Sequence, residues 1–138
     1  MKRILIAPIL VAYATTLVVF LGMDFIWLTL MTPRLYRPDL GPLMAAKPNL
    51  IAAGVFYVAF MVGLVVFAVA PALERRNWSR ATGLGALFGV LAYGTYDLTN
   101  LATLRGFTLR LTLADMVWGA AVSAVAATAG YLAAARTS

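Results

Sequence analysis

The hydrophobic positions along the chain form four long, nearly uncharged runs that are separated by short polar connections. The runs cover residues 4–31, 50–72, 81–103 and 111–135. An α-helix needs roughly 20 consecutive apolar residues to cross the hydrocarbon core of a bilayer. The pattern therefore predicts an all-α integral membrane bundle of four transmembrane helices, formed by residues 1–138 as a single domain.

Small residues recur at a helical interval in the last two runs. Gly85 and Gly89 are four residues apart in the third run, and Gly119 and Ser123 have the same spacing in the fourth. Small residues at this interval let helix backbones approach closely. The spacing favours packing within one four-helix bundle, and a contact between copies is the alternative. Four helices are few for a transporter, which is one of the functions considered below, so we also expect a homo-oligomer.

Composition supports the membrane interpretation and excludes several kinds of chemistry. Hydrophobic residues make up 63% of the chain and charged residues only 12%, and the mean hydropathy is +0.91. A net charge of +6 could favour nucleic acid, but the basic residues lie in clusters between the apolar runs, where they meet lipid headgroups. The chain has neither cysteine nor histidine, which excludes disulfides and removes the commonest metal ligand. We expect membrane lipids as partners, no nucleic acid, no metal and no cofactor.

Basic residues in the connections predict an orientation across the membrane, since cytoplasmic loops carry an excess of them. With four spans, the termini and the connection after the second run share one side. That side holds six basic residues and the other holds five, namely Lys2, Arg3, Arg75, Arg76, Arg80 and Arg136 against Arg34, Arg37, Lys47, Arg105 and Arg110. This small excess favours cytoplasmic termini.

Three acidic residues lie inside the apolar runs and converge on one depth. Asp24 and Asp97 come shortly before the outer ends of the first and third runs, and Asp115 shortly after the outer start of the fourth. At 1.5 Å of rise per residue, all three lie on the order of 6–10 Å below the same boundary. Tyr57 of the second run reaches a similar depth. Three helices thus deliver a carboxyl group to one layer.

Structural roles compete with a functional role for these acids. Asp115 follows Thr112 at the spacing of a capping box, which would make it part of a helix start. Asp24 and Asp97 approach C-terminal helix ends, where the dipole disfavours negative charge, so they need a cation, a proton or water. Arg34, Arg37, Arg105 and Arg110 are candidate partners. The remaining acids, Asp39 and Glu74, fall in connections and are expected to be solvated.

Aromatic and amide side chains accompany the acids at helical spacing. Residues three apart share a helix face. The pairs at this spacing are Asp24 with Trp27, Asp97 with Asn100, and Asp115 with Trp118. An interfacial aromatic belt would explain the tryptophans without any ligand. Alternatively, the pairs form a pocket with polar groups and aromatic walls, to which Tyr96 also contributes.

The first connection, "TPRLYRPDLGPLMAAKP", contains four prolines and is not expected to form a continuous helix. Its apolar residues Leu40, Leu43 and Met44 favour a short segment that lies on the membrane or covers the layer of acids.

At "MDFIWLTLMTPRLYRPDLGPLM", "YGTYDLTNLATLRGF" and "DMVWG", the chain resembles the small bacterial membrane proteins grouped as domain of unknown function 2177. The resemblance spans nearly the whole chain. It implies a multi-pass protein of the bacterial inner membrane with four helices and does not imply a particular activity. The residues that match the family's motif are Asp24, Trp27, Tyr36, Tyr96, Asp97, Asn100, Asp115 and Trp118.

Three functions fit these residues. The first is binding or transport of a small ligand, coupled to proton exchange at the acids. The second is a membrane-embedded acid–base enzyme that acts on a lipid or isoprenoid, and the third is an accessory subunit of a membrane complex. Whether the protein is an enzyme stays open at this point. The candidate ligand-binding or proton-exchange residues are Asp24, Trp27, Tyr96, Asp97, Asn100, Asp115 and Trp118, and the candidate partners or lid residues are Arg34, Tyr36, Arg37, Arg105 and Arg110.

Overall fold

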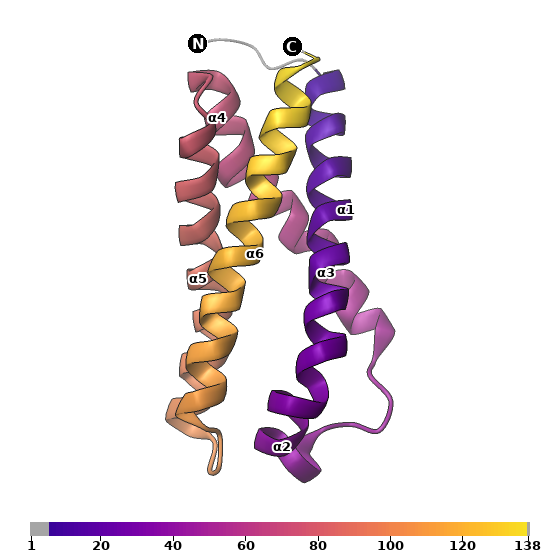
Figure 1. Ribbon diagram of the computed structural model, residues 1–138, viewed down its shortest axis with the longest axis vertical. Coiled ribbons are helices and arrows are strands. Elements are labelled where there is room, and N and C mark those ends of the chain that lie inside the picture. Colours follow the sequence, from indigo (N-terminus) through magenta and orange to yellow (C-terminus); the bar gives the residue numbers. More distant parts are fainter. Residues whose placement is uncertain (1–5, 138) are drawn as a thin grey trace.

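The computed structural model describes residues 6–137, which form four long helical arms running up and down (Figure 1). The start of α1 (Ile6–Met31), the end of α6 (Leu109–Ala135) and the turn between α4 (Ala70–Arg75) and α5 (Trp78–Thr103) lie at one end. The α5–α6 turn and α2 (Arg37–Leu40) lie at the other. The all-α membrane bundle is thereby confirmed. The arms are α1 (Ile6–Met31), then α3 (Leu50–Leu64) continued by η3 (Val65–Val69) and α4 (Ala70–Arg75), then α5 (Trp78–Thr103) and α6 (Leu109–Ala135). Residues 4 and 5 of the first run, and Lys2 and Arg3 of the orientation argument, lie outside the described residues.

Three of the arms are long and apolar enough to cross a membrane, namely Ile6–Leu43, Leu50–Arg75 and Leu109–Ala135. The fourth, α5, is as long as α1, at 26 residues, but its sequence is less apolar. The difference is understandable from its packing, because α5 lies along α6 and buries several of its polar and small residues there. It forms the fourth arm of the bundle beside three candidate membrane spans.

The small residues bring α5 and α6 together. A Cβ atom on Gly85 would lie 2.9 Å from both the Ala127 Cβ and the Ser123 carbonyl oxygen. A Cβ atom on Gly89 would collide with the carbonyl oxygen of Gly119. The spacing of small residues therefore serves packing within one bundle, which was the favoured interpretation.

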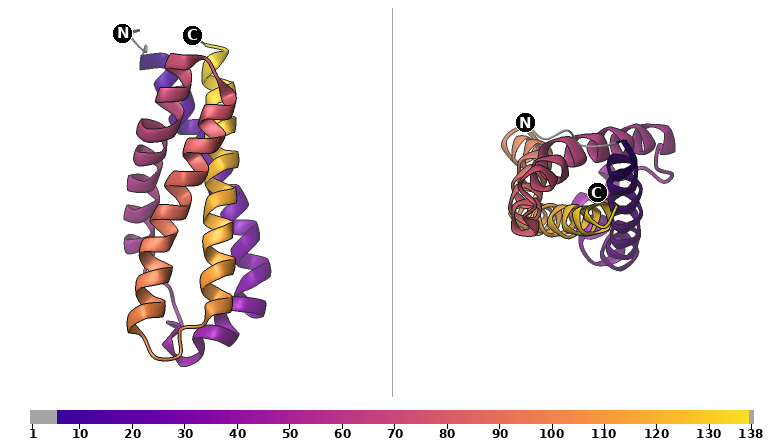
Figure 2. Two further views of the ribbon diagram at one scale, coloured as in Figure 1. Left: turned by 90° about the vertical axis from the view of Figure 1, so that its left-hand side faces the viewer. Right: turned by 90° about the horizontal axis from the view of Figure 1, so that it is seen from above.

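The second arm leaves the bundle at its α3 end. Seen from above, the arms surround a common axis, and α3 runs outward past α1 (Figure 2). The segments η3 and α4 pack on α5 and α6, whereas α3 packs mainly on α1. The first residues of α3 are open on all sides, with Leu50 76% and Ile51 82% exposed. In a bilayer, this half of α3 has lipid as its principal neighbour.

Proline explains the change of helix type within the second arm. Pro71 has no N–H to give to the carbonyl of Phe67 four residues earlier. The backbone widens here into the π-helical turn η3, which begins at Val65, and α4 then resumes with Pro71 in its first turn. Such turns bend helices. The bend is located where α3 diverges from the rest of the arm.

The proline-rich connection is more helical than expected. After α1 the chain continues through the π-helical turn η1 (Thr32–Tyr36), the short helix α2 (Arg37–Leu40) and the 3₁₀ turn η2 (Gly41–Leu43). Pro33 and Pro38 are accommodated because each occupies the first turn of a new segment. The helix α2 ends where Gly41 adopts a φ of 54°, which suits a residue without a Cβ. The connection is therefore helical up to Leu43, but in short turns of three different types, so it is not one continuous α-helix, as predicted.

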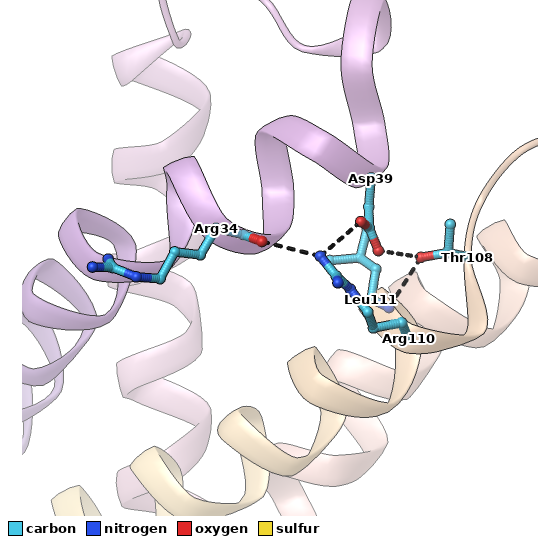
Figure 3. Close-up of polar contacts among 5 residues, drawn as sticks. All are labelled: Arg34, Asp39, Thr108, Arg110 and Leu111. Carbon is cyan, nitrogen blue, oxygen red and sulfur yellow. Dashed lines mark hydrogen bonds and ion pairs between the residues drawn. The ribbon is translucent and has the colours of Figure 1, made fainter.

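This segment is fastened to the start of α6 by a polar cluster, here named the end latch: Arg34, Asp39, Thr108 and Arg110 (Figure 3). Arg110 Nη2 lies 3.0 Å from Asp39 Oδ1 and also donates to the Arg34 carbonyl at 3.0 Å. Thr108 Oγ1 donates to Asp39 Oδ2 at 2.6 Å. The carbonyl of Arg34 is available because Pro38, four residues later, has no N–H.

The end latch corrects two predictions. Asp39 is not solvated: its side chain is only 10% exposed and its ionic partner is Arg110. The candidate arginines do not reach the intramembrane acids, because Arg110 pairs with Asp39 and Arg34 donates to its own helix at Leu30 O. Arg37 and Arg105 are exposed. Glu74 is exposed, as predicted.

A small apolar cluster lies beside the end latch. Leu35, Phe107 and Leu111 are buried together, and Trp27 and Leu101 pack against them. These residues join η1, the α5–α6 turn and the start of α6, so they close this end of the bundle between the latch and the acid-bearing layer.

Candidate functional site

The three intramembrane acids are buried and belong to one cluster. Asp24 of α1 is 6% exposed, Asp97 of α5 is 0% exposed and Asp115 of α6 is 8% exposed. Their convergence follows from helix geometry, since each residue stands a similar distance from the end of its arm. The structure thus brings together the three carboxyl groups that the sequence placed at one depth.

Asp24 accepts hydrogen bonds from two other arms. Trp118 Nε1 of α6 donates to Asp24 Oδ1 at 3.1 Å. The Tyr57 hydroxyl of α3 donates to Asp24 Oδ2. Each carboxyl oxygen therefore has a donor, and the pair of bonds ties α1 to α6 and to the diverging helix α3.

Asp115 is connected to α1 through a tyrosine. Trp27 Nε1 donates to the Tyr36 hydroxyl at 2.7 Å, and this hydroxyl donates to Asp115 Oδ1 at 2.5 Å. The capping-box interpretation of Asp115 is wrong. The N-cap of α6 is Thr108, whose side chain accepts from Leu111 N, so Asp115 lies well inside the helix.

The pairs Asp24–Trp27 and Asp115–Trp118 contact one another through stacked rings and hydrogen bonds. The rings of Trp27 and Trp118 stack with centroids 4.5 Å apart and planes inclined by 5°. Trp118 bonds directly to Asp24 of the opposite helix, and Trp27 reaches Asp115 of the opposite helix through Tyr36. Because α1 and α6 run in opposite directions, the Asp–x–x–Trp repeat produces two similar halves around the stacked rings. An aromatic belt facing headgroups would not need these bonds.

Asp97 differs from Asp24 and Asp115, which both accept hydrogen bonds from aromatic side chains. Both of its carboxyl oxygens are buried, and neither accepts a hydrogen bond from an N–H or hydroxyl donor of the described residues. Its charged neighbour is Asp115, whose carboxyl group is close enough for an electrostatic interaction and, when one of the two acids is protonated, for a hydrogen bond. Throughout residues 6–137 the single ion pair is that of Arg110 with Asp39, so no lysine or arginine compensates the three acids. In the same residues no group of carboxyl side chains is arranged to hold a metal ion.

A cavity of about 270 Å³ opens beside Asp115 between α3, α5 and α6. Its other lining residues are Phe56, Ala92, Tyr93 and Tyr96. The cavity is near the lower end of the size of small-molecule sites, roughly 300–1,000 Å³. A second, more open groove of about 490 Å³ lies on the other side of α3, where Asp24 and Tyr57 line it. The outward course of α3 creates both openings.

The remaining candidates occupy the edges of this region. Tyr96 is 54% exposed and lines the cavity, and its ring lies 6.1 Å from Phe107 in an edge-to-face arrangement. Asn100 is partly buried one helical turn beyond Asp97. Of the candidate partners, Tyr36 is the one that contacts the acid cluster.

Comparison with known proteins identifies the family. The family model described as "Predicted membrane protein (DUF2177)" matches residues 9–132 of the chain. The chain belongs to the DUF2177 family. No curated protein and no solved structure matches it. The DUF2177 match contains the whole acid cluster, the stacked tryptophans and the end latch.

Sequence reasoning missed two residues of this DUF2177 site, Phe56 and Tyr93. Tyr93 precedes Asp97 by four residues and therefore shares its helix face, which is a signal the sequence does contain. Its ring covers Gly119, where any Cβ atom would collide with it. Phe56 lines the cavity because α3 diverges, and no pattern in the sequence indicates that divergence.

The hydroxyl of Tyr57 should hold α3 against α1. We expect Tyr57→Phe to lower the free energy of unfolding by about 1–2 kcal/mol, because Asp24 Oδ2 then loses its donor in a buried site. Tyr13→Phe is the matched control, since the Tyr13 hydroxyl also bridges α1 and α3 but makes an exposed bond of 3.4 Å to Val58 O. Thermal unfolding in detergent would measure both variants. Equal melting temperatures for the two variants would contradict the assigned role.

Proposed function

We propose that this DUF2177 protein binds a small ligand within the membrane at the carboxyl–aromatic cluster and exchanges a proton with it. The ligand carries a cationic group or a hydrogen-bond donor. The site comprises Asp24, Asp97 and Asp115 with the stacked pair Trp27 and Trp118. Transport of that ligand, coupled to the proton, is the function this chemistry serves.

The buried carboxyl group of Asp97 carries the proposal. An unpartnered polar group in a low-dielectric interior costs about 1–3 kcal/mol or more, and natural structures keep few of them. Asp97 has neither a hydrogen-bond donor nor a nearby cation in the described part of the chain. A proton, or a donor brought by a ligand, satisfies this group. Ionisable residues inside membranes commonly mark substrate paths and proton relays for the same reason.

The surroundings favour a cationic or donor group over an anion. The cluster contains three carboxyl groups, which repel anions. Aromatic faces attract cations through their quadrupole, and Tyr93 and Tyr96 line the cavity beside Asp115. Asp97 and Asp115 lie close enough for an electrostatic interaction, so two negative charges there would repel one another. A bound cation would remove this repulsion.

Localisation and assembly form part of the proposal. The protein would reside in the bacterial inner membrane with its termini in the cytoplasm, and would act as a homo-oligomer. The basic residues Arg75, Arg76 and Arg80 at the α4–α5 turn support this orientation, since they would then face the cytoplasm.

Native mass spectrometry tests the proposal. Wild type should carry a bound small molecule or lipid after gentle extraction from the membrane, and Asp97→Asn should lose most of it while keeping its fold. Asp39→Asn is the matched control, since it removes an acid of the end latch that lies away from the cavity, and it should retain the ligand. Equal occupancy in wild type and Asp97→Asn would overturn the proposal. A partner protein lost from the variant would instead identify an accessory subunit.

Acid–base catalysis on a lipid or isoprenoid is the second candidate, favoured by the aromatic lining of the cavity at Asp115. One carboxylic acid would protonate an alkene, and a neighbouring carboxylate would remove a different proton, so that the double bond migrates. The rings of Tyr93 and Tyr96 would stabilise the intervening cation. Membranes with wild-type protein should then differ in lipid composition from membranes with Asp115→Asn, and identical compositions would exclude this candidate.

A further inference from the structure

We infer that the ligand is an amphiphile of the bilayer that enters sideways between α3 and α5, with its polar head at Asp115 and its apolar part against Phe56. This inference rests on the proposed function and specifies both the class of ligand and its route.

The composition of the opening indicates an amphiphile. The cavity between α3 and α5 has a single charged lining residue, Asp115, and its other walls are Phe56, Ala92, Tyr93 and Tyr96. Asp97 interacts with Asp115, is fully buried, and accepts no hydrogen bond from an N–H or hydroxyl donor of the described residues. A molecule that fits this site has one donor or cationic group and otherwise presents hydrocarbon.

The course of α3 leaves the side of the bundle open. The α3 helix packs mainly on α1, and its continuation η3 packs on α5 (Figure 2). Its surface at the opening is apolar, and Phe56, which lines the cavity, is 47% exposed. Within a bilayer, acyl chains contact this surface, so the cavity communicates with the hydrocarbon region without any movement of the helices.

The route from water is closed at the nearer end. The end latch joins the segment after α1 to the start of α6 through Arg110 and Asp39. Next to it, Leu35, Phe107 and Leu111 fill the space between these elements. A polar solute from that side would have to break the latch and then cross an apolar cluster, whereas a lipid needs neither step.

Carbodiimides of different solubility test the route in vesicles that contain the full chain. A carboxylic acid adds across a C=N bond of the reagent, and the O-acylisourea rearranges to a stable N-acylurea that retains every atom of both molecules. At acidic pH, dicyclohexylcarbodiimide, which partitions into lipid, should label Asp97 or Asp115 at least about tenfold faster than a cationic, water-soluble carbodiimide, because the bilayer excludes charge. Peptide mass spectrometry would locate the label. Equal labelling by the two reagents, or none by the lipid-soluble one, overturns the inference.

Two variants distinguish the side opening from the latched end. Ala92→Phe places a ring in the cavity and should reduce labelling by the lipid-soluble reagent, whereas Ala102→Phe, at an exposed position of the same helix, should not. Arg110→Gln removes both bonds of Arg110 in the end latch and should accelerate labelling by the water-soluble reagent alone. If Ala92→Phe and Ala102→Phe label alike, ligands do not pass between α3 and α5.

Protection of the wild type tests the class of ligand and does not depend on how any variant folds. The probe is N,N-dimethylhexadecylamine, which combines a cationic N–H donor with a long tail and cannot be acylated by the activated acid. It should protect Asp97 and Asp115 from dicyclohexylcarbodiimide, whereas trimethylamine and hexadecane, each holding one half of the molecule, should not. Protection by trimethylamine alone would show that the tail is dispensable, and would overturn the assignment of an amphiphilic ligand. If the labelling route is as expected but native mass spectrometry finds no Asp97-dependent ligand, the proposed function fails and the lateral route remains.

Discussion

Asp97→Leu is expected to stabilise the fold while abolishing ligand retention. The variant removes a fully buried carboxyl group that accepts no hydrogen bond from an N–H or hydroxyl donor of the described residues, and replaces it with an apolar side chain that has the same number and branching of heavy atoms. The gain should be about 1–3 kcal/mol in the free energy of unfolding, the usual cost of an unsatisfied buried polar group. Thermal unfolding in detergent, with native mass spectrometry on the same samples, would measure both effects.

Asp39→Leu is the matched control for Asp97→Leu. Asp39 accepts from Thr108 and pairs with Arg110, so its loss leaves both donors without their partner and should lower the melting temperature. The same substitution is thus expected to have opposite effects at the two acids. If Asp97→Leu destabilises the protein as much as Asp39→Leu does, Asp97 has a structural role, and the argument for a binding site loses its main support.

The second large effect is expected at the contact between α5 and α6. Gly89→Ala places a Cβ atom against the carbonyl oxygen of Gly119, and backbone at such a crossing cannot rotate out of the way. The two helices would have to separate, which should cost about 1–3 kcal/mol or more and reduce the amount of folded protein. Melting temperature and the yield of monodisperse protein in detergent are the measurements.

Gly83→Ala provides the comparison on the same helix. Gly83 has open space where a Cβ atom would lie, so the substitution should stabilise α5 slightly through helix propensity, by roughly 1 kcal/mol at most. Because both variants change glycine to alanine in α5, their difference isolates the contact with α6. A tolerated Gly89→Ala would mean that α5 and α6 are farther apart in the membrane.

Most of the fold could be predicted from the sequence, because the apolar stretch of a membrane helix must match the thickness of the hydrocarbon core. The four runs lie within a few residues of the arms, and the depth of Asp24, Asp97 and Asp115 follows from a constant rise per residue. The small-residue spacing also predicted the α5–α6 contact. These features depend on periodicity and length, which a single sequence displays.

The details of the site could not be predicted, because they depend on irregular backbone segments that no periodic pattern in the sequence indicates. Thr112 matched the spacing of a capping box, but the free N–H groups at the start of α6 lie one turn earlier and are capped by Thr108. Arg110 was a candidate partner for the intramembrane acids, yet Pro38 exposes the Arg34 carbonyl and helps to hold Arg110 at the end latch. The hydroxyl donors Tyr36 and Tyr57 reach the acids through a π-helical turn and a diverging helix, respectively.

The stacked indoles also make the site optically visible. The rings of Trp27 and Trp118 are close and nearly parallel, so their electronic transitions couple and should give a paired signal in near-ultraviolet circular dichroism. The third tryptophan of the chain, Trp78, is 58% exposed at the start of α5, at the opposite end of the bundle, and contributes as an isolated chromophore (Figure 1). A molecule that disturbs the hydrogen bonds of Asp24 or Asp115 would alter the coupled signal and leave that of Trp78 unchanged. Occupancy of the carboxyl layer can therefore be followed by spectroscopy on the unlabelled native chain.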